Sequence, residues 1–216
     1  MAKLKVGVLI SGRGSNMASL VRAAWEEDYP AEIACVVSNV ADAPGVKIAR
    51  DAGIATAVIS HGDYPEREIF ERAVTAELDK HGVRLVALAG FMRVLSPWFP
   101  QYWQGRIVNI HPSLLPAFKG LDAQQKAIDA GARVSGCTVH FVVPEIDGGP
   151  IIAQAAVRVL AGDTANSLAN RILQQEHRLY PLVVRWFAEG RLRQTDGRVE
   201  VTGVPPGATL LFSGEP

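Results

Sequence analysis

Near its start the chain carries its most informative stretch, Leu4-Lys5-Val6-Gly7-Val8-Leu9-Ile10-Ser11-Gly12-Arg13-Gly14-Ser15-Asn16. The apolar run Leu4–Ile10 contains several β-branched residues, which favours a strand. A glycine-rich turn follows at once, and from Met17 to Trp25 the apolar residues recur with helical spacing. Strand, turn and helix in this order are typical of the first unit of an α/β domain that binds a nucleotide or a phosphate at the start of the helix.

The details of this turn narrow the ligand. Met17 stands where the dinucleotide-binding fingerprint has its third small residue, and the turn has no lysine of the Walker type. The loop therefore favours a phosphate monoester, held by amide donors at the helix start. The alternative is a tight turn that needs glycine only for its backbone angles.

Strands and helices alternate along the rest of the chain. This alternation predicts a Rossmann-like α/β fold with a mostly parallel central sheet flanked by helices. Further strands are expected at 31–38, 56–59, 85–89, 106–111, 136–143 and 151–157, and helices at 44–51, 65–81, 97–103, 121–130 and from a cap at 163 or 164 to about 189. We expect residues 1–190 to form one domain and residues 191–216 to form a short β-rich C-terminal tail packed on it.

The composition fits a single globular domain with a small appendage, since the chain has 216 residues of which 48% are hydrophobic. Its 22 basic and 22 acidic residues cancel, which argues against a general nucleic-acid or membrane-surface binder. No signal peptide or membrane-spanning run is apparent, and Cys35 and Cys137 lie in apolar surroundings typical of buried free thiols. We therefore expect a cytoplasmic protein; its oligomeric state is left open.

The strand before Pro112 ends in two polar side chains, Asn109 and His111. Residues two apart in an extended chain point the same way, so these side chains share a direction. A neutral donor beside a titratable donor at a strand end indicates a site for a carbonyl that becomes an oxyanion. The alternative is that both side chains merely satisfy backbone groups of the following loop.

Asp147 sits in a glycine-flanked turn that can reach the same edge of the sheet as His111. A carboxylate near an imidazole favours its protonated form, which could donate to an oxyanion or protonate a leaving nitrogen. The competing interpretation is an ordinary Asp-Gly turn. His140 and Thr138 share a strand face and are expected to form a structural pair.

The sequence lacks the patterns that are typical of several other kinds of active site. The cysteines and histidines show no paired short spacing of the zinc kind, so we expect no metal site. No Gly-x-Ser-x-Gly nucleophile elbow occurs. Because no obvious nucleophile is present, the attacking group is expected to come from a substrate such as an amine.

At this point the sequence resembles a known family, the folate-dependent formyltransferases. The resemblance extends from the first strand to about Gly190 and rests on several spaced motifs. They are Asn109-x-His111-Pro112-Ser113-Leu114-Leu115-Pro116, Glu145-Ile146-Asp147-Gly148-Gly149-Pro150, Ile10-Ser11-Gly12-Arg13-Gly14-Ser15-Asn16, Ala89-Gly90-Phe91-Met92-Arg93-Val94-Leu95-Ser96 and Gln175-Glu176-His177.

The resemblance implies an enzyme of purine biosynthesis. It would transfer the formyl group of the co-substrate 10-formyltetrahydrofolate to the amine of 5'-phosphoribosylglycinamide. The positions that match Asn109, His111 and Asp147 are catalytic in the family: the first two stabilise the tetrahedral oxyanion, and the aspartate tunes the histidine and assists proton transfer.

The resemblance also implies two sets of binding residues. Those expected at the ribonucleotide are Gly14, Ser15, Asn16, Glu176 and Lys119. Those expected at the folate are Arg67, Met92, Arg93, Val94, Leu95, Val143, Pro144, Glu145 and Ile146. The chain departs from many relatives at Asp122 and Gln124, where they carry histidines, and from some relatives at Leu173, where they carry a polar residue.

Two rival functions remain open at this level. A formyltransferase that acts on another amine, such as methionyl-tRNA or a sugar nucleotide, would share the asparagine, histidine and aspartate. The transfer-RNA enzymes usually carry a further C-terminal domain with a basic face, for which the short tail leaves little room. A non-catalytic nucleotide-binding module would use the glycine-rich loop but would give Asn109, His111 and Asp147 no common role.

Overall fold

The structure is a computed structural model that describes residues 2–205 and 209–212. Two compact units make up the chain. Unit 1 comprises residues 1–109 and 142–144, and unit 2 comprises residues 110–141 and 145–216. Residues 206–208 and 213–216 of the expected C-terminal tail lie outside the described residues.

Unit 1 is built on parallel strands in the order β3-β2-β1-β4-β5. These strands are β1 (Leu4–Ile10), β2 (Ala31–Ser38), β3 (Thr56–Val58), β4 (Leu85–Leu88) and β5 (Ile107–His111), the last two residues of β5 belonging to unit 2. The strand order reverses between β1 and β4, and ligands of open α/β sheets bind at the carboxyl ends of strands at such a reversal. The glycine-rich loop follows β1 there.

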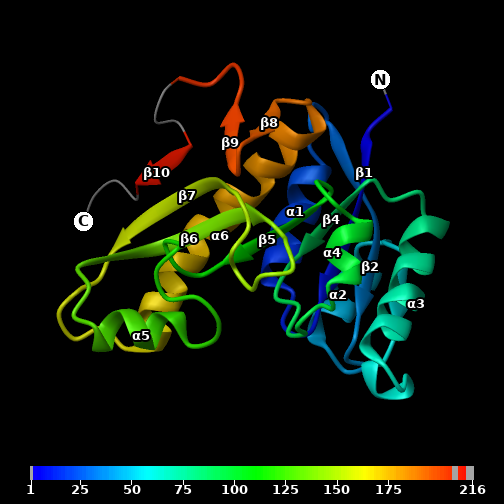
Figure 1. The fold of residues 1–216 in the computed structure, drawn as a ribbon, viewed down its shortest axis with the longest axis horizontal. Coiled ribbons are helices and arrows are strands. Elements are labelled where there is room, and N and C mark those ends of the chain that lie inside the picture. Colours follow the sequence, from blue (N-terminus) through cyan, green and yellow to red (C-terminus); the bar gives the residue numbers. More distant parts are fainter. Residues whose placement is uncertain (1, 206–208, 213–216) are drawn as a thin grey trace. The chain divides into compact units, whose positions relative to one another are not determined.

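Helices cover both faces of these strands. They are α1 (Ser15–Ala24), α2 (Pro44–Asp51), the 3₁₀ helix η1 (His61–Asp63), α3 (Arg67–Lys80) and α4 (Trp98–Tyr102). Pro44 begins α2, where its fixed backbone angle suits the first turn of a helix. Helices α1 and α2 lie on one side of β2, and α3 lies on the other (Figure 1).

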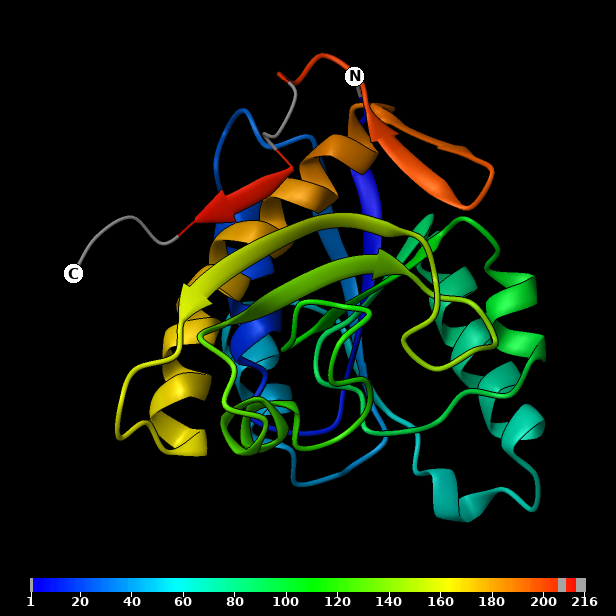
Figure 2. The same cartoon turned by 60° about the vertical axis from the view of Figure 1, so that its left-hand side comes forward.

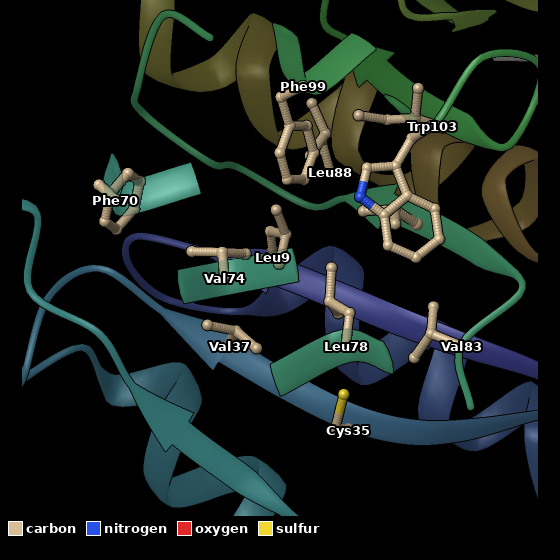
Figure 3. Close-up of a cluster of buried hydrophobic side chains, with 12 residues drawn as sticks. Leu9, Cys35, Val37, Phe70, Val74, Leu78, Val83, Leu88, Phe99 and Trp103 are labelled. Atoms are coloured by element: carbon tan, nitrogen blue, oxygen red, sulfur yellow. The ribbon is translucent and has the colours of Figure 1, made fainter. Parts of the chain in front are cut away.

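A cluster of buried apolar side chains joins α3 and α4 to one face of the strands (Figure 3). Leu9, Val37 and Leu88 come from successive parallel strands, while Leu78 and Trp103 come from the helical layer. Side chains alternate between the two faces of a strand, so residues two apart, such as Cys35 and Val37, reach the same core. Burial of this apolar surface provides the main stabilisation of unit 1.

Unit 2 is organised around the antiparallel pair β6 (Val134–Phe141) and β7 (Ile151–Arg158). The long helix α6 (Ala165–Ala188) packs along both strands (Figure 2) and begins with a capping box between Thr164 and Ser167. The remaining elements are α5 (Ala123–Asp129), β8 (Leu192–Thr195), β9 (Arg198–Val201) and β10 (Leu210–Phe212). β8 pairs with β9 in a separate small sheet, and β10 pairs in parallel with β7.

The predicted fold class is confirmed: the chain is α/β and Rossmann-like, with a mostly parallel sheet, flanking helices and short strands near the C-terminus. The division into a domain of residues 1–190 and a tail of residues 191–216 stays a prediction. Among residues 2–205 and 209–212, no helix is both long enough and apolar enough to cross a membrane.

Candidate active site

His111 and Asp147 meet in unit 2, as the sequence suggested they could. His111 ends β5 and is only 6% exposed, and its Nδ1 lies 3.4 Å from Oδ2 of Asp147. Asp147 belongs to the turn between β6 and β7 and is itself largely buried. Polar groups that are shielded from water interact more strongly than those on the surface, so this contact is a candidate for a functional one.

The second ring nitrogen of His111 also faces an acceptor. Nε2 lies 3.1 Å from the carbonyl oxygen of Phe118. A carbonyl oxygen can only accept, so Nε2 carries a proton and donates it. His111 therefore has an oxygen acceptor near each of its ring nitrogens, the Phe118 carbonyl at Nε2 and the Asp147 carboxylate at Nδ1.

The backbone fixes the position of Asp147. Its φ of 49° lies in the left-handed region, which aspartate tolerates better than most residues. The Gly120 N–H donates to its Oδ2 at 2.8 Å. Gly149 packs its backbone on β6, where an added Cβ would lie 1.8 Å from the carbonyl oxygen of Phe141. This turn therefore depends on glycine to bring the carboxylate to His111.

His140 approaches the same carboxylate, with Nε2 3.7 Å from Oδ1 of Asp147. Its Nδ1 donates to the Phe141 carbonyl at 2.8 Å. Burial lowers the pKa of His140, so this imidazole is neutral near pH 7 and adds no positive charge beside Asp147.

The neighbouring strand fastens the loop that follows His111. Thr138 Oγ1 donates to the Ser113 carbonyl at 2.7 Å and accepts from the Leu115 N–H at 3.0 Å. Gln154 Nε2 donates to Thr138 Oγ1 and to the Leu115 carbonyl, both at 3.0 Å. This network holds the backbone on the C-terminal side of His111.

Two other predicted binding residues of unit 2 are paired with each other. Lys119 Nζ lies 2.8 Å from Glu145 Oε1, although the family resemblance implies that the lysine contacts the ribonucleotide and the glutamate contacts the folate. Ile146, next to Glu145, is exposed. Glu176 lies on α6 and is buried, and its charge is one of the causes that raise the pKa values of Cys137 and Tyr180, after burial.

Most of the predicted residues of unit 1 lie near the carboxyl ends of its strands or at the start of a helix. Asn109 is half-buried on β5, two residues before His111. Ser15 and Asn16 begin α1, directly after Gly14. Arg67 begins α3 and is exposed, while Val143 and Pro144 follow the end of β6.

Gly14 allows the glycine-rich loop to pack against α2. Its φ is +75°, and an added Cβ would lie 2.6 Å from the Cα of Gly45. The Gly45 N–H donates to the Gly12 carbonyl at 3.0 Å. Both the backbone angle and the close approach of two backbones therefore require glycine at position 14.

We expect Gly14→Ala to destabilise the protein by about 2 kcal/mol or more, through the strained backbone angle and the contact with Gly45. Gly12→Ala is the matched control, since an added Cβ there meets nothing within 4 Å. Urea unfolding of both variants measures the difference. Equal loss of stability in the two variants would contradict the packing argument.

The loop after β4 presents apolar side chains to solvent. Met92 is 64% exposed and Val94 is 53% exposed, and Arg93 between them is exposed as well, while Leu95 packs against the core of unit 1. Exposed apolar side chains of this kind can contact an apolar ring system of a ligand.

Buried Glu71 fastens the far end of this loop. Its carboxylate accepts hydrogen bonds from the Ser96 N–H, at 2.6 Å, and from the Ser96 hydroxyl. Glu71 is 1% exposed, and burial raises its pKa above the ordinary value for a glutamate. Reasoning from sequence missed Glu71, because a glutamate in an amphipathic helix looks like any solvent-facing residue.

Neither cysteine is among the candidate site residues. Cys35 and Cys137 are both free and buried. Burial raises the pKa of Cys35 to about 12 and raises that of Cys137 as well, so both thiols stay protonated. Within residues 2–205 and 209–212, no group of three or more His, Cys, Asp and Glu side chains is arranged to hold a metal ion.

Comparison with known proteins identifies the class of enzyme to which this Rossmann-like chain belongs. Residues 4–184 match the Formyl transferase family, so the chain belongs to this family of enzymes, as the sequence motifs predicted. It is 43% identical to the phosphoribosylglycinamide formyltransferase of Escherichia coli K12 over 205 residues, which cover 94% of this chain and 97% of that protein.

A crystal structure of phosphoribosylglycinamide formyltransferase from Anaplasma phagocytophilum superposes with a TM-score of 0.90 at 46% identity, covering 98% of this chain and 99% of that one. The chain is also 48% identical over 191 residues to the trifunctional purine biosynthetic protein adenosine-3 of Gallus gallus. That match covers 88% of this chain and only 19% of the longer protein.

Proposed function

We propose that the protein transfers the formyl group of 10-formyltetrahydrofolate to the amine of 5'-phosphoribosylglycinamide, a step of purine biosynthesis. The observation that carries the proposal is the buried pair of His111 Nδ1 and Asp147 Oδ2, 3.4 Å apart, on a chain 43% identical to the E. coli enzyme of that name. The cytoplasmic location expected from the sequence stays a prediction.

The proposed chemistry is direct transfer. The amine nitrogen of the ribonucleotide attacks the formyl carbon, and the carbonyl oxygen becomes an oxyanion. The bond between that carbon and N10 of the folate then breaks, while the proton lost by the amine passes to N10. Only groups that bind the oxyanion more strongly than the starting carbonyl accelerate this step.

Asn109 and His111 are the proposed oxyanion donors. They lie two residues apart on β5, so strand geometry directs both side chains to one face. The Nε2–H of His111 now donates to the Phe118 carbonyl; in the proposed step the oxyanion replaces that carbonyl as acceptor. Asp147 stabilises the protonated imidazole and, through water, takes the proton from the amine and returns one to N10.

The binding residues divide between the two substrates. We propose that Gly14, Ser15 and Asn16 hold the phosphate at the start of α1, where backbone N–H groups and the helix dipole favour an anion. Glu176 would interact with the glycinamide amine, and Lys119 would leave Glu145 to meet the ribonucleotide.

The folate is assigned to two segments and one side chain. They are the Met92–Leu95 loop, residues 143–146 and Arg67. The exposure of Met92 and Val94 supports this assignment, since the apolar ring of a folate would cover both side chains.

The test is the transfer reaction with the purified protein. We expect release of tetrahydrofolate from 10-formyltetrahydrofolate only when 5'-phosphoribosylglycinamide is present. The change in absorbance measures this release. A reaction without the amine is the control for hydrolysis. No turnover with this amine but turnover with methionyl-tRNA or an amino sugar nucleotide would overturn the substrate and keep the chemistry, and no turnover with any amine would leave a non-catalytic nucleotide-binding module.

A further inference from the structure

The hydroxyl of Ser11 connects the glycine-rich loop after β1 to the exposed loop after β4. Its oxygen accepts the N–H of Met92 at 2.7 Å, although the two residues are 81 positions apart in sequence. The backbone N–H of Ser11 donates to the Gly90 carbonyl at 3.1 Å. The side chain and the backbone of Ser11 therefore both hold the start of the Gly90–Pro97 loop. Ser11 is also directly followed by Gly12 of the glycine-rich loop.

A directed chain of hydrogen bonds fixes the orientation of this hydroxyl. Ser11 Oγ donates to Asn39 Oδ1 at 2.5 Å, and Asn39 Nδ2 donates to His61 Nδ1 at 3.2 Å. An amide nitrogen can only donate, so Nδ1 of His61 is the acceptor. Asn39 is buried directly after β2, and both ends of its amide are hydrogen-bonded. Ser11 is thereby left with its lone pairs directed to Met92.

The opposite end of the same loop is fixed independently. Glu71 holds both the N–H and the hydroxyl of Ser96 from the buried side of α3. The exposed residues Met92 and Val94 lie between these two attachments. Movement of the glycine-rich loop can therefore reach Met92 through Ser11, while the Ser96 end stays in place.

We propose that Ser11 is a positioning residue that couples binding of the ribonucleotide phosphate at Gly14–Asn16 to binding of the folate at Met92–Leu95. This inference rests on the proposed function, which assigns the two ligands to these two loops. A ligand bound at one loop orders the Ser11 contact that joins the two loops. A second ligand at the other loop then binds at a smaller cost in conformational entropy of the protein. The coupling is positive and acts equally in both directions.

Binding measurements with two unreactive ligands test the coupling. Tetrahydrofolate, which has no formyl group to transfer, is titrated by calorimetry into the protein with and without saturating 5'-phosphoribosylglycinamide. In the unchanged protein we expect the ribonucleotide to tighten tetrahydrofolate binding about five- to tenfold. In Ser11→Ala we expect this factor to fall to about one, with the ribonucleotide still bound.

Two further variants separate positioning from general stability. Ser11→Thr keeps the hydroxyl and is expected to keep most of the coupling. Ser38→Ala is the matched control, because Ser38 is a buried serine whose hydroxyl bonds with Val40 of its own turn, donating to the carbonyl at 2.8 Å and accepting from the N–H at 3.1 Å. It is expected to lower stability without changing the coupling factor.

The outcomes distinguish the coupling from the function beneath it. Equal coupling in Ser11→Ala and the unchanged protein would overturn the role of Ser11, as would a factor of one in the unchanged protein. Loss of coupling in Ser38→Ala to the same extent would show a general effect of stability and would also overturn it. If the unchanged protein bound neither ligand, the proposed function would fail, and the coupling with it.

Discussion

Asp147→Asn is expected to lower kcat by about 10³- to 10⁴-fold, because an amide cannot take up the proton that the carboxylate moves. The amide is nearly the same size, and its oxygen can still accept the Gly120 N–H that now bonds Asp147 Oδ2 at 2.8 Å. The same oxygen position lies 3.4 Å from Nδ1 of His111, while the NH₂ group would take the place of Oδ1, 3.7 Å from Nε2 of His140. His111 would lose the negative charge beside it while the fold of the turn stays intact.

Steady-state kinetics and ribonucleotide binding measure this effect separately. A residue that acts only on the reaction lowers kcat while the dissociation constant of the ribonucleotide changes little. Asp129→Asn is the matched control, since Asp129 is an exposed carboxylate at the end of α5 in the same unit. An Asp147→Asn variant that kept a tenth of the turnover, or that lost ribonucleotide binding in parallel, would contradict the proposed role.

Trp103→Ala is expected to cost about 3–5 kcal/mol of unfolding free energy, the usual range for removing a buried tryptophan. Trp103 is 0% exposed, packs beside Phe99, and donates from Nε1 to Thr75 Oγ1 at 3.3 Å (Figure 3). Alanine would leave both a cavity and a buried hydroxyl without this donor. Since whole domains are stable by about 5–15 kcal/mol, one substitution would remove a large share.

A second tryptophan of unit 1 provides the control for this measurement. Trp25 follows α1 and is 67% exposed, so Trp25→Ala should change the stability by no more than about 0.5 kcal/mol. Urea unfolding followed by circular dichroism measures both variants. Similar midpoints for the two would show that Trp103 does not anchor the core.

Local sequence determined most of the elements of the fold. The predicted limits of β1, β2 and α2 agree with the structure, because β-branched runs and Pro44 act within a few residues. The predicted start of α5 at Leu121 was wrong: Asp122 has a left-handed φ of 57°, so the helix begins at Ala123. β6 ends at Phe141 rather than Val143, because the Val142 N–H turns to the Ile107 carbonyl.

The candidate site was predictable only where it depends on short distances along the chain. Alternation along β5 gave Asn109 and His111 a common direction, and this needs no tertiary information. That Asp147 reaches His111 could be proposed from the order of strands, but its distance depends on how the β6–β7 turn packs. The contact between Ser11 and Met92 spans 81 residues, and no local pattern indicates it.

The two buried thiols give each compact unit its own reporter. Cys35 lies in unit 1 and Cys137 in unit 2, and protonated thiols enclosed in a core do not react with alkylating reagents. Modification therefore requires transient opening of the surrounding structure, and its rate reports the local opening equilibrium. Mass spectrometry after pulsed alkylation can thus measure local opening in unit 1 and in unit 2 of the native chain without any engineered label.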